Sequence, residues 1–171
     1  MERNVGKIKI GGVMQSDGRA LLKVMSVPDH ASVAGTVLGA LGESGINIEL
    51  LAESFDLDDC GNFSLVVDQK DLDQAIEIME GVQPIIDAGA VSYTPDVAVI
   101  TVFSHHLREK PYIHGLMFSS MAAAGISSLA ISTSISSVSC VIEGQHLDLA
   151  VQALSETFDI PFDVKKRPKD Y

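Results

Sequence analysis

Histidines and aspartates are the first candidates for chemistry in this chain of 171 residues. His105, His106 and His114 lie close together in the sequence, but they lack the spacing of cysteine, histidine and carboxylate ligands that a closed metal site requires. The run Asp56–Asp59 superficially resembles a calcium-binding loop, but the glycine and the final glutamate of that loop are missing at the required offsets. We therefore expect no metal ion and no other cofactor.

A glycine pair and a serine-rich stretch are the remaining candidates. Gly11-Gly12 follows a strand-like pattern, and a simple turn explains it better than a phosphate-binding loop does. Ser127–Ser139 is rich in serine, but no histidine and acid accompany it in an order that would activate a nucleophile. The sequence therefore favours binding over catalysis, and we predict that the protein is not an enzyme.

The chain contains one structural pattern twice. Val27–Ile48 and Arg108–Ser128 each read as a strand end followed by a helix that closes with Gly-Ile. A second match pairs DLDQAIEIM, which begins at Asp71, with HLDLAVQAL, which begins at His146. The two copies are separated by roughly 80 residues, which is too long for a solenoid repeat. Each copy predicts strand, helix, two strands and helix, so the expected fold class is α+β with two ferredoxin-like βαββαβ modules.

Composition restricts the partners. Hydrophobic residues make up 46% and charged residues 20% of the chain, as in ordinary globular proteins. The formal net charge is −11, and Lys165-Lys166-Arg167 is the largest basic cluster, so neither nucleic acid nor an anionic membrane is an expected partner. We find no signal peptide and no apolar run long enough to span a bilayer. Cys60 and Cys140 are therefore expected to be reduced thiols in a cytoplasmic protein.

Helix signals are clear in both copies. The first helix of each copy has apolar residues at helical spacing, namely Val33, Val37, Leu38 and Leu41 in one copy and Ile113, Met117 and Met121 in the other. Ser32 is the expected N-cap of the first helix, and Gly45 and Gly125 are the expected left-handed ends. Asp71 and Gln74 resemble a capping box for the next helix.

Strand signals are clearer in the first copy than in the second. The predicted strands are Leu21–Val27, Ile46–Ser54, Asn62–Val67 and Ala90–Tyr93 in the first copy, and Val97–Phe103, Leu129–Thr133 and Ser137–Ile142 in the second. The second copy lacks an equally good fourth strand, because Phe158 is followed by Pro161 and a basic tail. Gly6–Val13 reads as a strand without a partner, and we place it at the open edge of the second sheet. The predicted domains are therefore residues 14–95, residues 96–160 with residues 6–13, and a C-terminal tail, residues 161–171.

These patterns carry a resemblance to a known family. The run from Val27-Pro28-Asp29 to Gly45-Ile46-Asn47-Ile48-Glu49 resembles the ACT domain, a module that binds small molecules. Gly125-Ile126, followed by Ile131–Ser134, resembles the second ACT module of aspartate kinases. The resemblance implies that the leading strand completes the second module. The amino-acid kinase domain of those enzymes has no counterpart in this sequence, so the resemblance implies feedback regulation rather than catalysis.

The resemblance also implies an amino-acid site in the first module. Its residues would come from the loop before the first helix, from the start of the next strand and from farther along that strand: Asp29, Ala31, Ser32, Val33 and Ala34; Asn47, Ile48 and Glu49; Glu53 and Ser54. The backbone N–H groups at a helix N-terminus suit a carboxylate, and a side-chain acid suits an ammonium group. Ser127 and Ser128 are the corresponding strand-start residues of the second module.

The sequence departs from the family pattern at several of these positions. Ala31-Ser32 replaces the usual Pro-Gly, Glu49 replaces a common Asp, and Glu53 replaces a usual Gln. The two additional acids would favour a cationic ligand such as lysine, provided that at least one of them faces the site. Tyr112 stands where glycine is expected in the second module, and we expect its bulk to narrow that site.

Each of these residues also has a purely structural interpretation. Asp29 could begin a turn, Asn47 could satisfy nearby backbone groups, and Glu49 and Glu53 could form a solvated strand face. Lysine and threonine are ligands by resemblance only, and methionine, a branched-chain amino acid or another metabolite are alternatives. Two functions remain open: a regulatory subunit of an aspartate-kinase-like enzyme, and a stand-alone sensor or structural dimer with a degenerate pocket. In both cases we expect a homodimer.

Overall fold

The computed structural model describes residues 6–28, 32–105, 107 and 109–167. The elements in chain order are β1 (Ile8–Lys9), β2 (Gly12–Pro28), α1 (Val33–Glu43), β3 (Leu50–Phe55), β4 (Cys60–Asp68), η1 (Gln69–Asp71), α2 (Leu72–Val82), β5 (Ala90–Phe103), α3 (Tyr112–Ala123), β6 (Ala130–Thr133), β7 (Ser137–Glu143), η2 (Gly144–His146), α4 (Leu147–Thr157), β8 (Phe158–Asp159) and β9 (Lys165–Lys166). The chain forms two compact units. We call Gly18–Val97 the first unit, and the residues up to Asp17 together with those from Ala98 onward the second unit.

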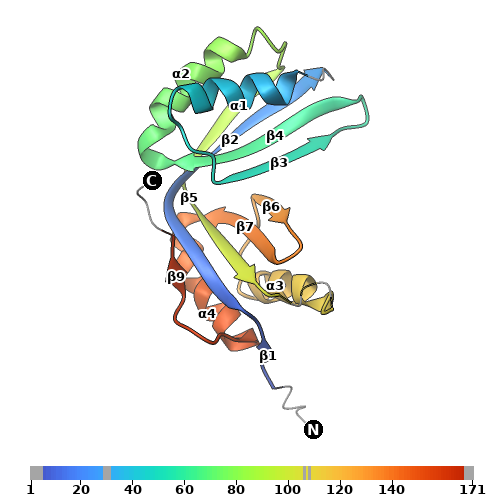
Figure 1. Cartoon of the computed structure of the whole chain (residues 1–171), viewed down its shortest axis with the longest axis vertical. Helices are drawn as coiled ribbons and strands as arrows, with labels where there is room; N and C mark the ends of the chain where they lie inside the picture. Colours follow the sequence, from blue (N-terminus) through green and yellow to red (C-terminus); the bar gives the residue numbers. More distant parts are fainter. Residues whose placement is uncertain (1–5, 29–31, 106, 108, 168–171) are drawn as a thin grey trace. The chain divides into compact units, whose positions relative to one another are not determined.

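The first unit is a sheet covered on one face by α1 and α2 (Figure 1). Its strand order is β3-β4-β2-β5, and β4 runs antiparallel to both β2 and β3. The apolar stripe predicted for α1 is largely confirmed, because Val33, Val37 and Leu41 are buried in the core and Leu38 packs against it at partial exposure. Strand residues such as Phe63 complete this core, and each fully buried side chain of this size stabilises the fold by about 1.5–3 kcal/mol.

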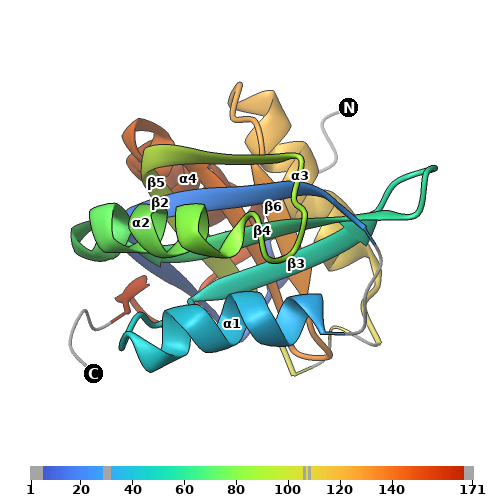
Figure 2. The ribbon, with the colours of Figure 1, turned by 90° about the horizontal axis from the view of Figure 1, so that it is seen from above.

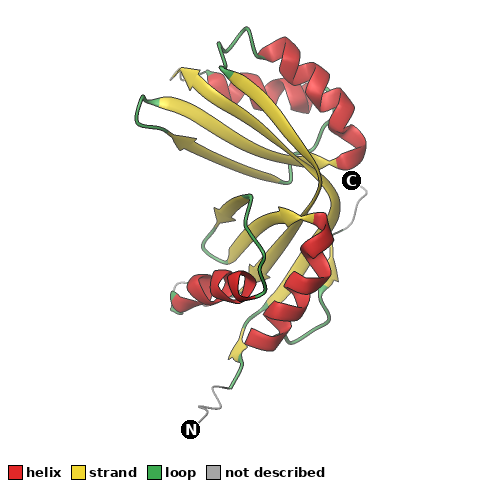
Figure 3. Cartoon of the chain, turned by 180° about the vertical axis from the view of Figure 1, so that it is seen from behind, coloured by secondary structure: helices red, strands yellow, loops and turns green. Residues whose placement is uncertain are grey.

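The second unit repeats this plan with α3 and α4 (Figure 3). Its sheet contains the N-terminal part of β2, the C-terminal part of β5, and then β7 and β6, while β9 pairs with β2 in parallel. Ile113, Met117 and Met121 of α3 are buried in the core of the second unit, as the sequence predicts. Ile10 and Val13 belong to the same core. The prediction that an N-terminal strand completes this sheet is therefore confirmed, as is the α+β fold of two βαββαβ modules.

The strands differ from the predicted ones in extent. β2 is one continuous strand from Gly12, and it includes Ser16-Asp17-Gly18, a sequence with turn propensity. β5 joins the two strands predicted at Ala90–Tyr93 and Val97–Phe103. Both extensions reflect pairing with neighbouring strands, which overrides a local preference. β3 begins at Leu50 rather than at Ile46.

The second unit also contains short strands where none was predicted. Phe158–Asp159 pairs in parallel with Ile8–Lys9, and Lys165–Lys166, predicted as part of the tail, pairs with β2. The predicted strand Gly6–Val13 is therefore divided, because only Gly12 and Val13 belong to β2. Two-residue pairings leave little periodicity in a sequence, which explains why the pattern did not reveal them.

The helix starts lack the predicted side-chain caps. Ser32 and Asp71 occupy the N-cap positions of α1 and α2, but neither side chain accepts a hydrogen bond from its helix. The carboxylate of Asp68 instead accepts a hydrogen bond from the backbone N–H of Lys70 and so caps the preceding turn η1. The capping box predicted for Asp71 and Gln74 is therefore wrong, because a 3-10 turn precedes α2 and the cap lies three residues earlier.

The Gly-Ile pairs end α1 and α3 in the same way. Gly45 has φ of +77° and Gly125 has φ of +75°, in the left-handed region that favours glycine. In each case the isoleucine N–H donates to the carbonyl five residues earlier, at 3.0 Å from Ile46 to Leu41 and at 2.9 Å from Ile126 to Met121. Both isoleucine side chains are buried. The repeat in the sequence is therefore a repeated helix end.

The β3–β4 hairpin extends past the N-terminus of α1 (Figure 2). The carboxylate of Asp56 organises its turn by accepting hydrogen bonds from the N–H groups of Cys60 at 3.0 Å and Asp58 at 2.9 Å, and these bonds lower the pKa of Asp56. Leu57 is fully exposed at the tip. The aspartates that superficially resemble a calcium loop therefore form a hairpin turn.

Candidate functional site

The sequence-predicted site of the first unit divides between the two ends of β3. Strand register defines these ends, because Val27 near the end of β2 and Phe55 at the end of β3 both lie opposite Gly61 of β4. The chain passes from Pro28 into α1 at this end, whereas Asn47–Glu49 precede Leu50 at the opposite end. Five residue steps of a strand separate the two ends by roughly 17 Å. Within one copy of the protein, the predicted site residues therefore lie in two groups at opposite ends of β3.

One part of the predicted site lies at the N-terminus of α1. Asp29 and Ala31 lie outside the described residues, and Ser32 is exposed. The Val33 side chain is buried in the core, so this residue can offer a ligand only its backbone. The Ser32 side chain does not cap the helix, and the N–H groups of its first turn carry the positive end of the helix dipole. This end of α1 can therefore accept a carboxylate.

Glu53 and Ser54 lie on β3 toward the same end. Both side chains are exposed, and in the strand register they lie opposite Phe63 and Asn62 of β4. β3 is the terminal strand of the order β3-β4-β2-β5, so its outer side is an edge of the sheet. The exposed Glu53 carboxylate supplies negative charge at the end of the unit where α1 begins, and it could pair with an ammonium group.

The other part of the predicted site, Asn47–Glu49, is a short link between α1 and β3. Asn47 is exposed, and the side chain of Ile48 packs against the core of the first unit. The backbone N–H of Glu49 donates to the carbonyl of Val66 at 2.8 Å. Its side chain is only 6% exposed, so Glu49 does not belong to a solvated strand face. Asn47 is the residue of this link whose side chain is available to a ligand.

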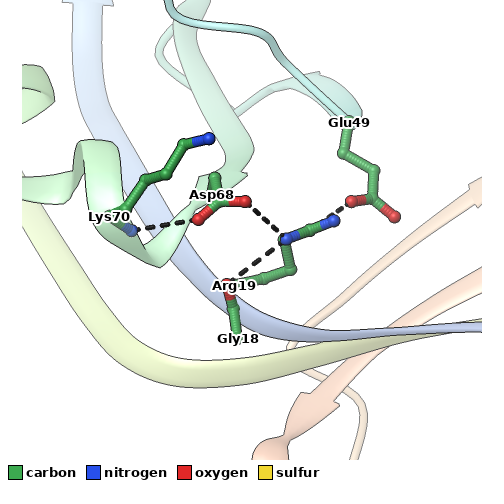
Figure 4. Close-up of polar contacts among 5 residues, drawn as sticks. All are labelled: Gly18, Arg19, Glu49, Asp68 and Lys70. Carbon is green, nitrogen blue, oxygen red and sulfur yellow. Dashed lines mark hydrogen bonds and ion pairs between the residues drawn. The ribbon is translucent and has the colours of Figure 1, made fainter. Parts of the chain in front are cut away.

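Arg19 holds the Glu49 carboxylate (Figure 4). The Arg19 Nε donates to a Glu49 oxygen at 2.5 Å, and its Nη1 donates to an Asp68 oxygen at 2.9 Å. Arg19 is itself buried, at 4% exposure. No local sequence pattern marks Arg19, because its two partners lie 30 and 49 positions away and only the pairing of β2 with β4 brings them together.

In the second unit, Ser127 and Ser128 line an open hollow of about 510 Å³ between α3 and β6. Apolar side chains, including those of Phe118 and Ile131, form much of its wall. Burial raises the pKa of the Cys140 thiol to about 11, and the Ser128 hydroxyl lowers it in part. Tyr112 is half exposed at the other end of α3 and does not line this hollow.

A second cavity of the second unit was not expected from the sequence. It has a volume of about 310 Å³ and is lined by residues such as Gly11, Phe103, His105, Phe162 and Lys165. The backbone at Gly11 approaches β5 closely, because an added Cβ would lie 3.1 Å from the carbonyl oxygen of Phe103. Gly11 of the glycine pair therefore serves this contact between segments. Among the described residues, no group of three or more histidine, cysteine or acidic side chains is arranged to hold a metal ion.

Comparison with known proteins gives consistent results. A model of the ACT domain family matches residues 100–158. Over 151 residues, the chain is 26% identical to an aspartate kinase of Stutzerimonas stutzeri and 28% identical to one of Pseudomonas putida. Each match covers 88% of this chain but only 37% of the relative, so the chain spans little more than a third of the length of these enzymes.

Two solved structures align with most of this chain. The structure of the aspartokinase alpha and beta subunits aligns with a TM-score of 0.79 and 26% identity, over 86% of this chain and 97% of the other. The regulatory subunit of aspartate kinase from Thermus flavus aligns with a TM-score of 0.80 and 24% identity, over 88% and 99%. Residues 100–158 of the second unit thus match the ACT domain family, and the chain as a whole shares its fold with aspartate kinase regulatory chains. It resembles the C-terminal regulatory region, or the separate regulatory subunit, of aspartate kinases.

None of the helices in the described part of the chain is long and apolar enough to cross a membrane.

Proposed function

We propose that this protein is a non-catalytic regulatory module that binds a free amino acid and transmits its presence to an aspartate-kinase-like enzyme of amino-acid biosynthesis. The observation that carries this proposal is the extent of the match to regulatory chains. The chain covers 97% of an aspartokinase subunit and 99% of a regulatory subunit, whereas it covers 37% of the complete kinases. Both ACT-like units thus correspond to the regulatory part of these proteins.

A twofold homodimer would join the two parts of the candidate site. A twofold axis makes the same patch meet itself in reverse order, so an antiparallel contact along the β3 edge would place the end of one β3 beside the start of the other. The α1 N-terminus and Glu53 of one copy would then approach Asn47 of its partner. The exposed edge of β3 supports this arrangement, since an unpaired edge is a natural site for association.

Lysine and threonine are the first ligands to test. One related structure is that of Escherichia coli aspartokinase III in complex with lysine and aspartate. In the present chain the Glu49 carboxylate is held by Arg19, so the negative charge available to a cationic ligand comes from Glu53. We therefore expect lysine to depend on Glu53 more than threonine does.

The alternative function is a stand-alone sensor or structural dimer without an enzyme partner. The departures from the family pattern, including Tyr112 at the start of α3, are the observations that favour it. Co-purification from the native cell distinguishes the two functions. A regulatory subunit should bring a kinase-like catalytic chain with it, whereas a stand-alone dimer should be recovered without one.

Titration calorimetry with L-lysine and L-threonine tests the proposed site. Asn47→Ala removes a neutral contact and should weaken the binding of both ligands. Glu53→Gln should weaken the binding of lysine by roughly ten- to a hundredfold, because a charge-assisted hydrogen bond contributes about 1.5–3 kcal/mol. Glu77→Gln on α2 is a matched control, since it removes one carboxylate away from β3. Unchanged binding in both site variants would place the ligand elsewhere.

A further inference from the structure

Arg19 is a buried cation at the start of the part of β2 that belongs to the first unit. Its side chain is 5% exposed, and the side chains of its two carboxylate partners are 6% exposed at Glu49 and 20% exposed at Asp68. The guanidinium therefore lies between the link that precedes β3 and the end of β4 (Figure 4). Charges are rarely buried unless they are paired, because removal from water is costly. The bonds to Glu49 and Asp68 therefore hold the Arg19 side chain in place, and Arg19 holds these two carboxylates in place.

The contact with Glu49 anchors one end of a short stretch of chain. Ile46 is the other anchor, because its side chain is 4% exposed and its N–H bonds to Leu41 at the end of α1. At Glu49 the backbone bonds to Val66 of β4 and the carboxylate bonds to Arg19. Only two residues lie between the anchors, and Asn47 is one of them. The orientation of the exposed Asn47 side chain therefore depends on both.

We propose that Arg19 is a positioning residue of the amino-acid site: the hydrogen bond that its Nε–H donates to the Glu49 side chain fixes the link that presents Asn47, and it withdraws the Glu49 carboxylate from the ligand. This inference rests on the proposed function. It assigns Glu49 a role opposite to the one that the sequence predicts, since Glu49 acts on the ligand only through the backbone of its own segment. Recognition of the amino acid then depends on Asn47 at one end of β3 and on Glu53 at the other.

Three substitutions separate positioning from direct contact. Arg19→Lys keeps the positive charge, but a single ammonium lacks the planar fork that holds two carboxylates at once. Asp68→Asn is the matched control, because it alters the same cluster without touching the link before β3. Glu49→Gln keeps an oxygen that can accept the Arg19 Nε–H and removes only the negative charge.

The experiment combines two measurements on the complete chain. Titration calorimetry measures the affinities for L-lysine and L-threonine, and amide hydrogen exchange measures the protection of the Glu49 N–H, which bonds to Val66. For Arg19→Lys we expect about tenfold weaker binding of both amino acids and about tenfold faster exchange at Glu49, with unchanged exchange in α2. For Glu49→Gln and Asp68→Asn we expect binding within about threefold of the wild type.

The outcomes are distinguishable. Wild-type binding by Arg19→Lys would overturn the inference and leave the proposed function intact. Equal loss of binding in Asp68→Asn would also overturn it, since the effect would then follow general stability rather than the link. Loss of lysine binding in Glu49→Gln with unchanged exchange would show that Glu49 touches the ligand directly, contrary to the inference. If the wild type bound neither amino acid, the proposed site and the role of Arg19 in recognising these effectors would both be wrong. This would hold even if hydrogen exchange showed that Arg19 fixes the link before β3.

Discussion

At the scale of single residues, the contact with Arg19 determines what Glu49 can do in the candidate site. The family pattern marks its position as one that faces the ligand, and the alternation of the segment suggests a solvated strand face. In the structure its carboxylate is buried against Arg19, which lies 30 positions earlier in the chain. Asn47, two residues away, is exposed as a ligand contact requires. Local pattern identified the segment, but the register of β2 and β4 decided which of its side chains is available.

The two cysteines differ in accessibility and give a prediction at this scale. Cys140 is fully buried and its pKa is raised to about 11, whereas Cys60 is partly exposed in the hairpin. A pH of 8 is three units below the pKa of the Cys140 thiol, so Cys140 is a reactive thiolate in about one molecule in a thousand. We expect iodoacetamide to modify Cys60 in the native protein and Cys140 only after unfolding. Mass spectrometry of digested samples measures both, and equal labelling of the native protein would contradict the burial of Cys140.

At the scale of elements, the repeated Gly-Ile ends of the helices were predictable and the continuous strands were not. A left-handed helix end requires a residue type that the sequence displays, so Gly45 and Gly125 could be identified from spacing alone. The continuity of β2 through Ser16-Asp17-Gly18 depends on partners from distant segments, including β4 and β9. The same limit applies to Phe158–Asp159, whose pairing with β1 involves only two residues.

Two glycines of the same helix region should respond to alanine in opposite directions. Gly45→Ala places a side chain at φ of +77°, and we expect it to lower the free energy of unfolding by about 1 kcal/mol. Gly39 lies inside α1, and an added Cβ would meet nothing within 4 Å, so Gly39→Ala should raise it by about 1 kcal/mol. Urea denaturation of both variants measures the difference. A loss of stability in Gly39→Ala would indicate that another molecule packs closely on this helix.

At the scale of the whole molecule, the N-terminal stretch is part of the fold rather than an appendage. Ile10 and Val13 are 5% and 3% exposed in the core of the second unit, and β1 pairs with β8. The sequence indicated this role because Gly6–Val13 had strand character and no partner nearby. It could not show that the stretch continues without interruption into the first unit through β2.

Deletion of residues 1–13 should therefore destabilise the protein globally. Removal of two buried aliphatic side chains costs at least about 4 kcal/mol, to which the lost pairing of β1 adds. We expect a clear fall in melting temperature by differential scanning calorimetry. Lys9→Ala serves as the control, since it keeps the backbone pairing of β1 and changes only an exposed side chain. A truncated chain that melts like the full chain would refute the role of this stretch.

A thermal-shift screen of the twenty proteinogenic amino acids, with the chiral ones as L-enantiomers, measures whether this protein binds a free amino acid as proposed. A ligand present at 100 times its dissociation constant stabilises the folded state by about 2.7 kcal/mol. For a chain of this length, that stabilisation corresponds to a rise in melting temperature of roughly 5–10 °C. We predict such a rise with lysine or threonine, and no rise with the D-enantiomer of the same amino acid. An unchanged melting temperature with all twenty amino acids would contradict amino-acid binding by this protein and favour the structural dimer.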